Sequence, residues 1–182
     1  AEGKRFTNEL LTRDVVSAAE LKQPGRFAWV FWDDATRKSA KLMDSYISMG
    51  LAVKGNTVAE IAKAMNVPAA ELEATLKAYA AGKAAGKDAF GRADMPQAMQ
   101  TAPFFAVKVQ PAVHHTMGGV KIDTKAEVLN PAGHTIPGLF AAGEVTGGVH
   151  GGNRLGGNAQ ADIVTFGRIA GQSADAYLKT AK

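Results

Sequence analysis

The sequence of 182 residues contains no cysteine, and this absence excludes several kinds of site. Without thiols these residues can form no disulfide, no thiolate zinc site, no iron–sulfur cluster and no covalent link to a c-type haem. Long apolar runs are also missing, because none approaches the ~18 residues of a membrane-spanning helix and none begins the chain. We therefore predict no membrane span, while the lack of cysteine leaves the compartment open.

Basic residues exceed acidic residues only slightly, which gives a net charge of +4. The segment 57–82 has the pattern of two helices separated by Pro68, and such a pair resembles a helix-turn-helix. A recognition helix presents Arg, Lys, Gln or Asn to bases and phosphates. The second helix offers Glu71 and Glu73, with only Lys77 opposing them. We expect two helices packed on a core and no nucleic-acid partner.

Composition and periodicity change near residue 111. Before it, 26–32 has the aromatic and β-branched residues of a strand, and 57–82 has helical periodicity. After it, the patterns predict a hairpin over 120–128, a strand over 136–144 and a helix over 159–178. The sequence therefore predicts an α+β fold in two parts, 1–111 and 112–182.

Most of the 20 glycines lie in the last third of the chain, and the loop 147–157 is the richest in them. Glycines let a ligand approach the backbone closely and leave N–H groups unshielded. The helix that follows adds its amino-terminal amides and positive dipole end, and Arg154 adds a cation. A flexible surface loop is the alternative, but the flanking strand and helix favour an anion-binding loop. Neither Gly-Lys-Ser/Thr nor Gly-x-Gly-x-x-Gly occurs in the chain.

Two adjacent histidines, His114 and His115, precede a Gly-Gly pair. Neighbouring residues on an extended segment point to opposite faces, so the two rings are poorly placed to chelate one metal and better placed to serve two neighbouring ligands. We predict no metal site. Glu144 ends an apolar strand, where acidic groups often meet a ribose or ribityl hydroxyl, although a solvated turn residue is the alternative. Arg13 by itself is an ordinary arginine at a helix start.

Four motifs are informative as a set: Gly3–Phe6 through Thr12–Asp14, His114–Gly119, Ala142–Glu144 and Gly152–Asn158. Together they resemble the FAD-dependent fumarate reductase and succinate dehydrogenase flavoprotein family, and most closely its soluble periplasmic flavocytochrome c type. The resemblance runs over essentially the whole chain. It implies an oxidoreductase of anaerobic respiration that reduces fumarate to succinate in the periplasm.

The resemblance also implies a role for each matching residue. Hydride passes from flavin N5 to one alkene carbon, and an arginine delivers the proton to the other. Arginine is a poor acid in water, so such a site must be desolvated and supplied by a proton relay. The implied proton donor is Arg13; the implied substrate ligands are His114, Arg154 and Gly157; the implied flavin contacts are His115, Glu144, Asn158, Ala159 and Gln160.

The family's glycine-rich FAD fingerprint, haem domain and upstream relay residues are absent from this sequence. The resemblance therefore implies a C-terminal portion of an enzyme, with 1–111 the C-terminal part of a capping (clamp) domain and 112–182 the C-terminal segment of a Rossmann-like FAD-binding domain. The expected partners are the upstream FAD-binding portion and an electron-donor cytochrome or haem c domain. We expect no activity from the portion alone. Two alternatives remain: a flavin reductase of another conjugated acid such as urocanate, and an inactive interaction module.

Overall fold

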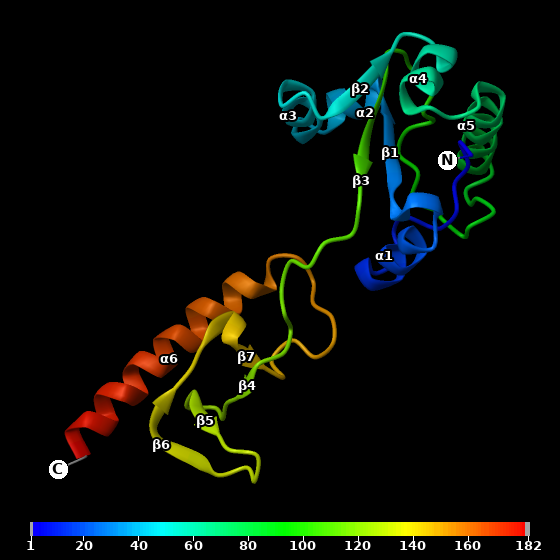
Figure 1. The fold of residues 1–182 in the computed structure, drawn as a ribbon. Coiled ribbons are helices and arrows are strands. Elements are labelled where there is room, and N and C mark those ends of the chain that lie inside the picture. Colours follow the sequence, from blue (N-terminus) through cyan, green and yellow to red (C-terminus); the bar gives the residue numbers. More distant parts are fainter. Residues whose placement is uncertain (1, 181–182) are drawn as a thin grey trace. The chain divides into compact units, whose positions relative to one another are not determined.

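The computed structural model describes residues 2–180, which form two compact units. Unit 1 is Ala1–Pro111 and unit 2 is Ala112–Lys182. Each unit combines helices with short strands (Figure 1), so the predicted mixed helix and sheet class is confirmed. None of the helices in the described range is both long and apolar enough to cross a bilayer.

Unit 1 is built on an antiparallel sheet with the strand order β1-β3-β2. The strands are β1 (Ala28–Asp33), β2 (Ala52–Gly55) and β3 (Phe104–Val109). Strand β1 starts two residues later than the predicted 26–32, because Pro24–Arg26 form the short 3-10 helix η1. Strand β3 ends at Val109, shortly before Pro111, which has no N–H to donate to a sheet.

Helices α4 (Val58–Met65) and α5 (Ala69–Ala84) cover one face of this sheet. Thr57 caps α4 by accepting a hydrogen bond from the Glu60 N–H at 3.1 Å, as the sequence pattern predicts. Asn66 ends α4 in the left-handed conformation, and Pro68 precedes α5. The buried cluster on this face consists of Ile61, Ala62, Met65, Leu72, Leu76, Phe104 and Ala106.

The other face packs against α3 (Leu42–Ser48), which follows α2 (Asp34–Ser39). Asp33 is buried and caps α2 through a hydrogen bond from the Thr36 N–H at 2.9 Å. Its second oxygen accepts from the Thr101 N–H at 3.0 Å, so this carboxylate also holds the segment that leads into β3. Helix α1 (Arg13–Leu21), like α3, contains no buried residue.

Unit 2 consists of two strand pairs, the short 3-10 helix η2 (Gly143–Val145) and the long helix α6 (Asn158–Thr180). Strands β5 (Glu127–Leu129) and β6 (Thr135–Phe140) pair antiparallel, and Phe140 packs edge-to-face on Tyr177 of α6. Strand β4 (Val120–Lys121) pairs parallel with β7 (Thr146–Gly147). The predicted hairpin over 120–128 is reduced to a single bridge between Ile122 and Val128, because β4 takes β7 as its partner.

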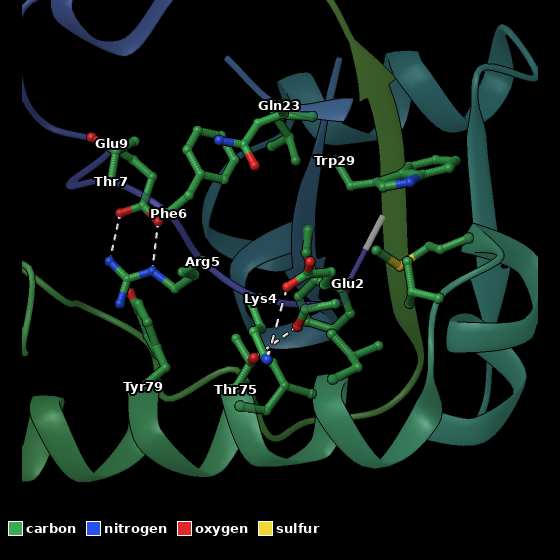
Figure 2. Close-up of a pocket in the computed structure, with 18 of the residues that line it drawn as sticks. Glu2, Lys4, Arg5, Phe6, Thr7, Glu9, Gln23, Trp29, Thr75 and Tyr79 are labelled. Atoms are coloured by element: carbon green, nitrogen blue, oxygen red, sulfur yellow. Dashed lines mark hydrogen bonds and ion pairs between the residues drawn. The ribbon is translucent and has the colours of Figure 1, made fainter. Parts of the chain in front are cut away.

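An ion-pair network fixes the N-terminal segment of unit 1. The Arg5 guanidinium donates to both Glu9 carboxylate oxygens, at 2.6 and 2.8 Å (Figure 2), and to Asp88 Oδ2 at 2.5 Å. It also lies over the rings of Tyr79 and Phe90 at 5.1 and 4.9 Å from their centroids. Burial by itself raises the pKa of the Asp88 carboxyl, but hydrogen bonds from Arg5 and from backbone N–H groups outweigh it and hold this pKa below its usual value.

Because of this network, we predict that the free energy of unfolding of unit 1 falls at acidic pH. A carboxyl whose pKa is lowered by folding stabilises the protein above its unfolded pKa and loses that contribution as the pH falls through the folded value. We expect Asp88→Asn to lower the free energy of unfolding by about 1.5–3 kcal/mol at neutral pH. The difference between variant and parent should shrink as the pH falls below 3.8, the ordinary value for Asp. Urea unfolding followed by tryptophan fluorescence measures it, with exposed Asp94→Asn as the control. A difference that does not depend on pH would contradict the prediction.

Candidate functional site

The site in unit 2 is organised by a close backbone contact between Gly119 and the segment 145–147. A Cβ on Gly119 would lie 2.0 Å from the Val145 carbonyl oxygen, and a Cβ on Gly147 would lie 2.7 Å from the Gly119 nitrogen. Only glycine allows this approach at both positions. Because β4 and β7 run parallel, the contact places the residues that precede the two strands at the same end of the pair.

Those preceding residues are bonded to each other. The Thr116 N–H donates to Glu144 Oε1 at 3.1 Å, and the Thr116 hydroxyl is 3.1 Å from the Glu144 carbonyl oxygen. Two of the predicted site segments, one containing His114 and His115 and the other containing Glu144, are therefore side by side in unit 2. His114 itself is exposed.

His115 has a defined ring state. Its Nδ1 accepts a hydrogen bond from the Met117 N–H at 3.1 Å, so the neutral ring carries its proton on Nε2. This Nε2 is buried and has no hydrogen-bond partner among residues 2–180. Since buried donors are almost always paired in folded proteins, His115 presents a donor for a group that is not part of the described chain.

A buried pair links the glycine-rich loop to α6. His150 Nε2 lies 3.0 Å from Asp162 Oδ2, and the two side chains are only 9% and 2% exposed. The His150 ring also packs edge-to-face on His115, with 5.3 Å between centroids. The pair thus fixes the middle of the loop against both the helix and the histidine segment. Sequence reasoning missed both residues, because no spacing rule relates a loop histidine to a helical aspartate twelve positions later.

Arg154 lies in the same loop. Its Nη1 donates to the Leu155 carbonyl oxygen at 3.3 Å, while its Nε is buried and unpaired within the described residues. The loop ends at Gly157, whose carbonyl oxygen accepts from the Gln160 N–H at 2.9 Å as α6 begins. The predicted flavin contacts Asn158, Ala159 and Gln160 are accordingly the first three residues of α6, directly after Arg154 and Gly157.

Arg13 belongs to the other unit, where it is the first residue of α1 and is exposed. The remaining predicted site residues all belong to unit 2. Among the described residues, no group of three or more His, Asp or Glu side chains is arranged to hold a metal ion.

The residues of unit 2 fit an electron-rich, anionic ligand. Two buried nitrogens, His115 Nε2 and Arg154 Nε, are donors that lack acceptors in the described part of the chain. The isoalloxazine ring of a flavin offers carbonyl oxygens and ring nitrogens, and a dicarboxylate offers carboxylate oxygens, so either can accept from these donors. The amino-terminal end of α6 adds the positive end of a helix dipole.

Comparison with known proteins identifies the family. The model of the FAD binding domain family matches residues 1–159, which is most of the chain. The chain belongs to this family. The match supports FAD as the cofactor that the sequence predicts.

Relatives in this family are named as reductases. The chain is 55% identical to the probable fumarate reductase Ifc3 of Shewanella frigidimarina over 95% of this chain and 30% of that protein. It is 36% identical to a urocanate reductase of Eggerthella lenta over 96% of this chain and 30% of that protein. The structure of an open flavocytochrome c3 fumarate reductase matches with a TM-score of 0.80 and 54% identity, over 97% of this chain and 31% of that one. The chain thus spans about a third of the length of these relatives.

The buried His150–Asp162 pair predicts how the loop responds to mutation. Asp162→Ala leaves His150 without its partner in a buried position, which we expect to destabilise unit 2 by roughly 1–3 kcal/mol. We also expect faster hydrogen exchange in the peptides that cover 147–157. Asp175→Ala is the matched control, because Asp175 lies on the same helix in an exposed pair with Lys179. Equal exchange rates in the loop for the two variants would show that the pair does not anchor it.

Proposed function

We propose that this chain is the C-terminal portion of an FAD-dependent fumarate reductase. One observation carries the proposal: His115 Nε2 and Arg154 Nε are buried donors in one unit and have no acceptor in the described chain. Both residues lie in motifs that resemble the family, and relatives with matching sequence are named fumarate reductases.

In this proposal His114, Arg154 and Gly157 bind a substrate carboxylate. The fixed Arg154 cation withdraws electron density from the conjugated alkene as a hydride arrives, which stabilises the developing negative charge. His115, Glu144 and the first turn of α6, formed by Asn158, Ala159 and Gln160, hold the flavin. The reduced flavin, when bound, supplies the hydride.

Arg13 is the proposed proton donor to the second alkene carbon. One hydride and one proton then convert fumarate to succinate. Because Arg13 is exposed in unit 1 and a guanidinium is a weak acid in water, the donor needs desolvation and a proton relay. In this proposal the desolvation and the proton relay come from the additional polypeptide that the longer relatives contain.

The proposal includes a domain assignment. Unit 1 is the C-terminal part of a capping (clamp) domain, and unit 2 is the C-terminal segment of the FAD-binding domain. The complete enzyme is proposed to receive electrons from a cytochrome or haem domain and to work in the periplasm in anaerobic respiration. The naming of matching proteins as cytochrome-type fumarate reductases supports the cytochrome as the electron donor.

Urocanate reduction is the second candidate. It is favoured by the match to a urocanate reductase at 36% identity over nearly the whole chain. Urocanate shares the conjugated carboxylate that His114 and Arg154 are proposed to bind, and it differs at the far end of the molecule. The 50–55% identity to fumarate reductases makes fumarate the first choice.

The proton-donor role predicts a specific loss of chemistry. In the complete enzyme, Arg13→Ala should reduce steady-state fumarate reduction by a factor of about 100 or more, because general acid catalysis contributes this much. Bound flavin, measured by its absorbance, should stay at the parental level. Lys22→Ala is the control, since it removes an exposed cation from the end of the same helix. Retained turnover in Arg13→Ala would place the acid elsewhere.

In this proposal only part of the flavin site lies in this chain. We therefore predict that the 182-residue chain does not retain FAD by itself. The Gly-x-Gly-x-x-Gly pyrophosphate fingerprint is absent, so the half-site in unit 2 lacks the contacts that dominate dinucleotide affinity. Equilibrium dialysis with FAD should detect weak binding or none, and the chain should show no fumarate reduction. Purification of the 182-residue chain with one equivalent of bound flavin would contradict this prediction.

A further inference from the structure

Asp162 is a buried acidic residue that the proposed reaction does not use. Its side chain is paired with His150, and its second oxygen, Oδ1, has no hydrogen-bond partner among residues 2–180. Burying a carboxylate is costly unless it is paired and hydrogen-bonded. Because apolar side chains of similar volume often stabilise such a position equally well, stability alone does not account for a polar pair here.

The His150 ring connects this carboxylate to His115. The two imidazole rings are nearly perpendicular, with an interplanar angle of 87° and 5.3 Å between their centroids. Edge-to-face packing is a preferred arrangement of aromatic rings. Since Asp162 belongs to helix α6, the contact ties the His115 ring to a regular element of unit 2.

His115 needs such support because its own segment, 110–119, contains neither helix nor strand. A histidine ring rotates broadly about its second side-chain torsion. The Met117 N–H holds one ring nitrogen, Nδ1, and Met117 adopts a left-handed φ of 57° that is uncommon for a residue other than glycine. This hydrogen bond sets the tautomer, and the His150 ring restricts the remaining rotation. Together they fix the direction of the His115 Nε2–H bond.

The direction of this bond matters for the chemistry proposed above, in which His115 is a flavin contact. Reduction adds electron density to the isoalloxazine ring, and hydrogen bonds to an acceptor that gains negative charge become stronger. Hydrogen bonds from the protein are one means of adjusting the electronic properties of a cofactor. A donor held in the correct direction therefore stabilises the reduced flavin more than the oxidised flavin.

We propose that His150 is a positioning residue. Its ring, held by Asp162, directs the His115 Nε2–H bond at the flavin and thereby raises the flavin reduction potential. The inference rests on the proposed function in one respect, namely that His115 contacts the flavin. His150 acts through His115, as residues that surround a site orient the groups that bind the ligand.

The first test measures the flavin midpoint potential of the complete enzyme by spectroelectrochemical titration. His150→Gln keeps a side-chain nitrogen for Asp162 but removes the aromatic ring. At the parental midpoint we expect the ratio of reduced to oxidised flavin to fall about tenfold, which corresponds to about 30 mV for a two-electron couple. His134→Gln is the matched control, because His134 is an exposed histidine of the same unit, and it should leave the midpoint unchanged.

A double-mutant cycle tests whether His150 acts through His115. His115→Phe removes the Nε2–H donor and keeps a ring at this position, so it should lower the potential by itself. In that background His150→Gln should cause no further change, because the group that it positions is already lost. Additive shifts in the double variant would contradict the proposal.

His150→Phe separates the ring from the hydrogen bond. It keeps an aromatic ring beside His115 but has no nitrogen for Asp162, so hydrogen exchange in 147–157 should become faster while the midpoint stays parental. A shift as large as the one expected for His150→Gln would assign the effect to a loosened loop and overturn the proposal. Loss of bound flavin from both variants would also overturn it, because the pair would then have a structural role only.

The outcomes for the proposed reaction and for the positioning role are distinguishable. An enzyme that reduces fumarate and shows no potential shift in His150→Gln would refute the positioning role and leave the reaction standing. An enzyme that shows the shift but does not reduce fumarate would refute the reaction and leave the positioning role standing.

Discussion

The close backbone contact between Gly119 and the segment 145–147 is the constraint on which the candidate site depends. A Cβ at Gly119 would collide with the Val145 carbonyl, so β4 and β7 can run side by side only with glycine there. Their parallel pairing brings Thr116 to Glu144 and sets the start of the glycine-rich loop. The His150–Asp162 pair then holds that loop against α6 and the His115 ring.

Both units contain buried polar atoms that have no hydrogen-bond partner among the described residues. Folded proteins pair nearly all such groups, because leaving a donor or acceptor unsatisfied is costly. In unit 2 the orphaned atoms include His115 Nε2 and Arg154 Nε, where a flavin and a carboxylate are proposed. In unit 1 they are Trp32 Nε1 and the Tyr79 hydroxyl.

Sequence patterns predicted those features that local chemistry determines. Apolar periodicity, the Thr57 cap and Pro68 predicted helices α4 and α5. Helix α6 was predicted directly after the glycine-rich loop, where the structure has it. Helices α2 and α3 were not predicted, because both are short and the cap of α2 is Asp33, a carboxylate that also binds the distant Thr101. The β4–β7 pairing and the His150–Asp162 pair were missed for the same reason, since each joins segments whose proximity only the fold establishes.

The central claim is that the complete enzyme transfers a hydride and a proton to fumarate. The most direct measurement is a single turnover, in which the FAD of the complete protein is reduced without oxygen and then mixed with one equivalent of fumarate or, separately, urocanate. Fumarate reductase activity predicts rapid return of the oxidised flavin spectrum with fumarate, formation of one equivalent of succinate, and little reoxidation by urocanate. A flavin that stays reduced with fumarate would contradict the claim, and rapid reoxidation by urocanate alone would assign the site to the second candidate.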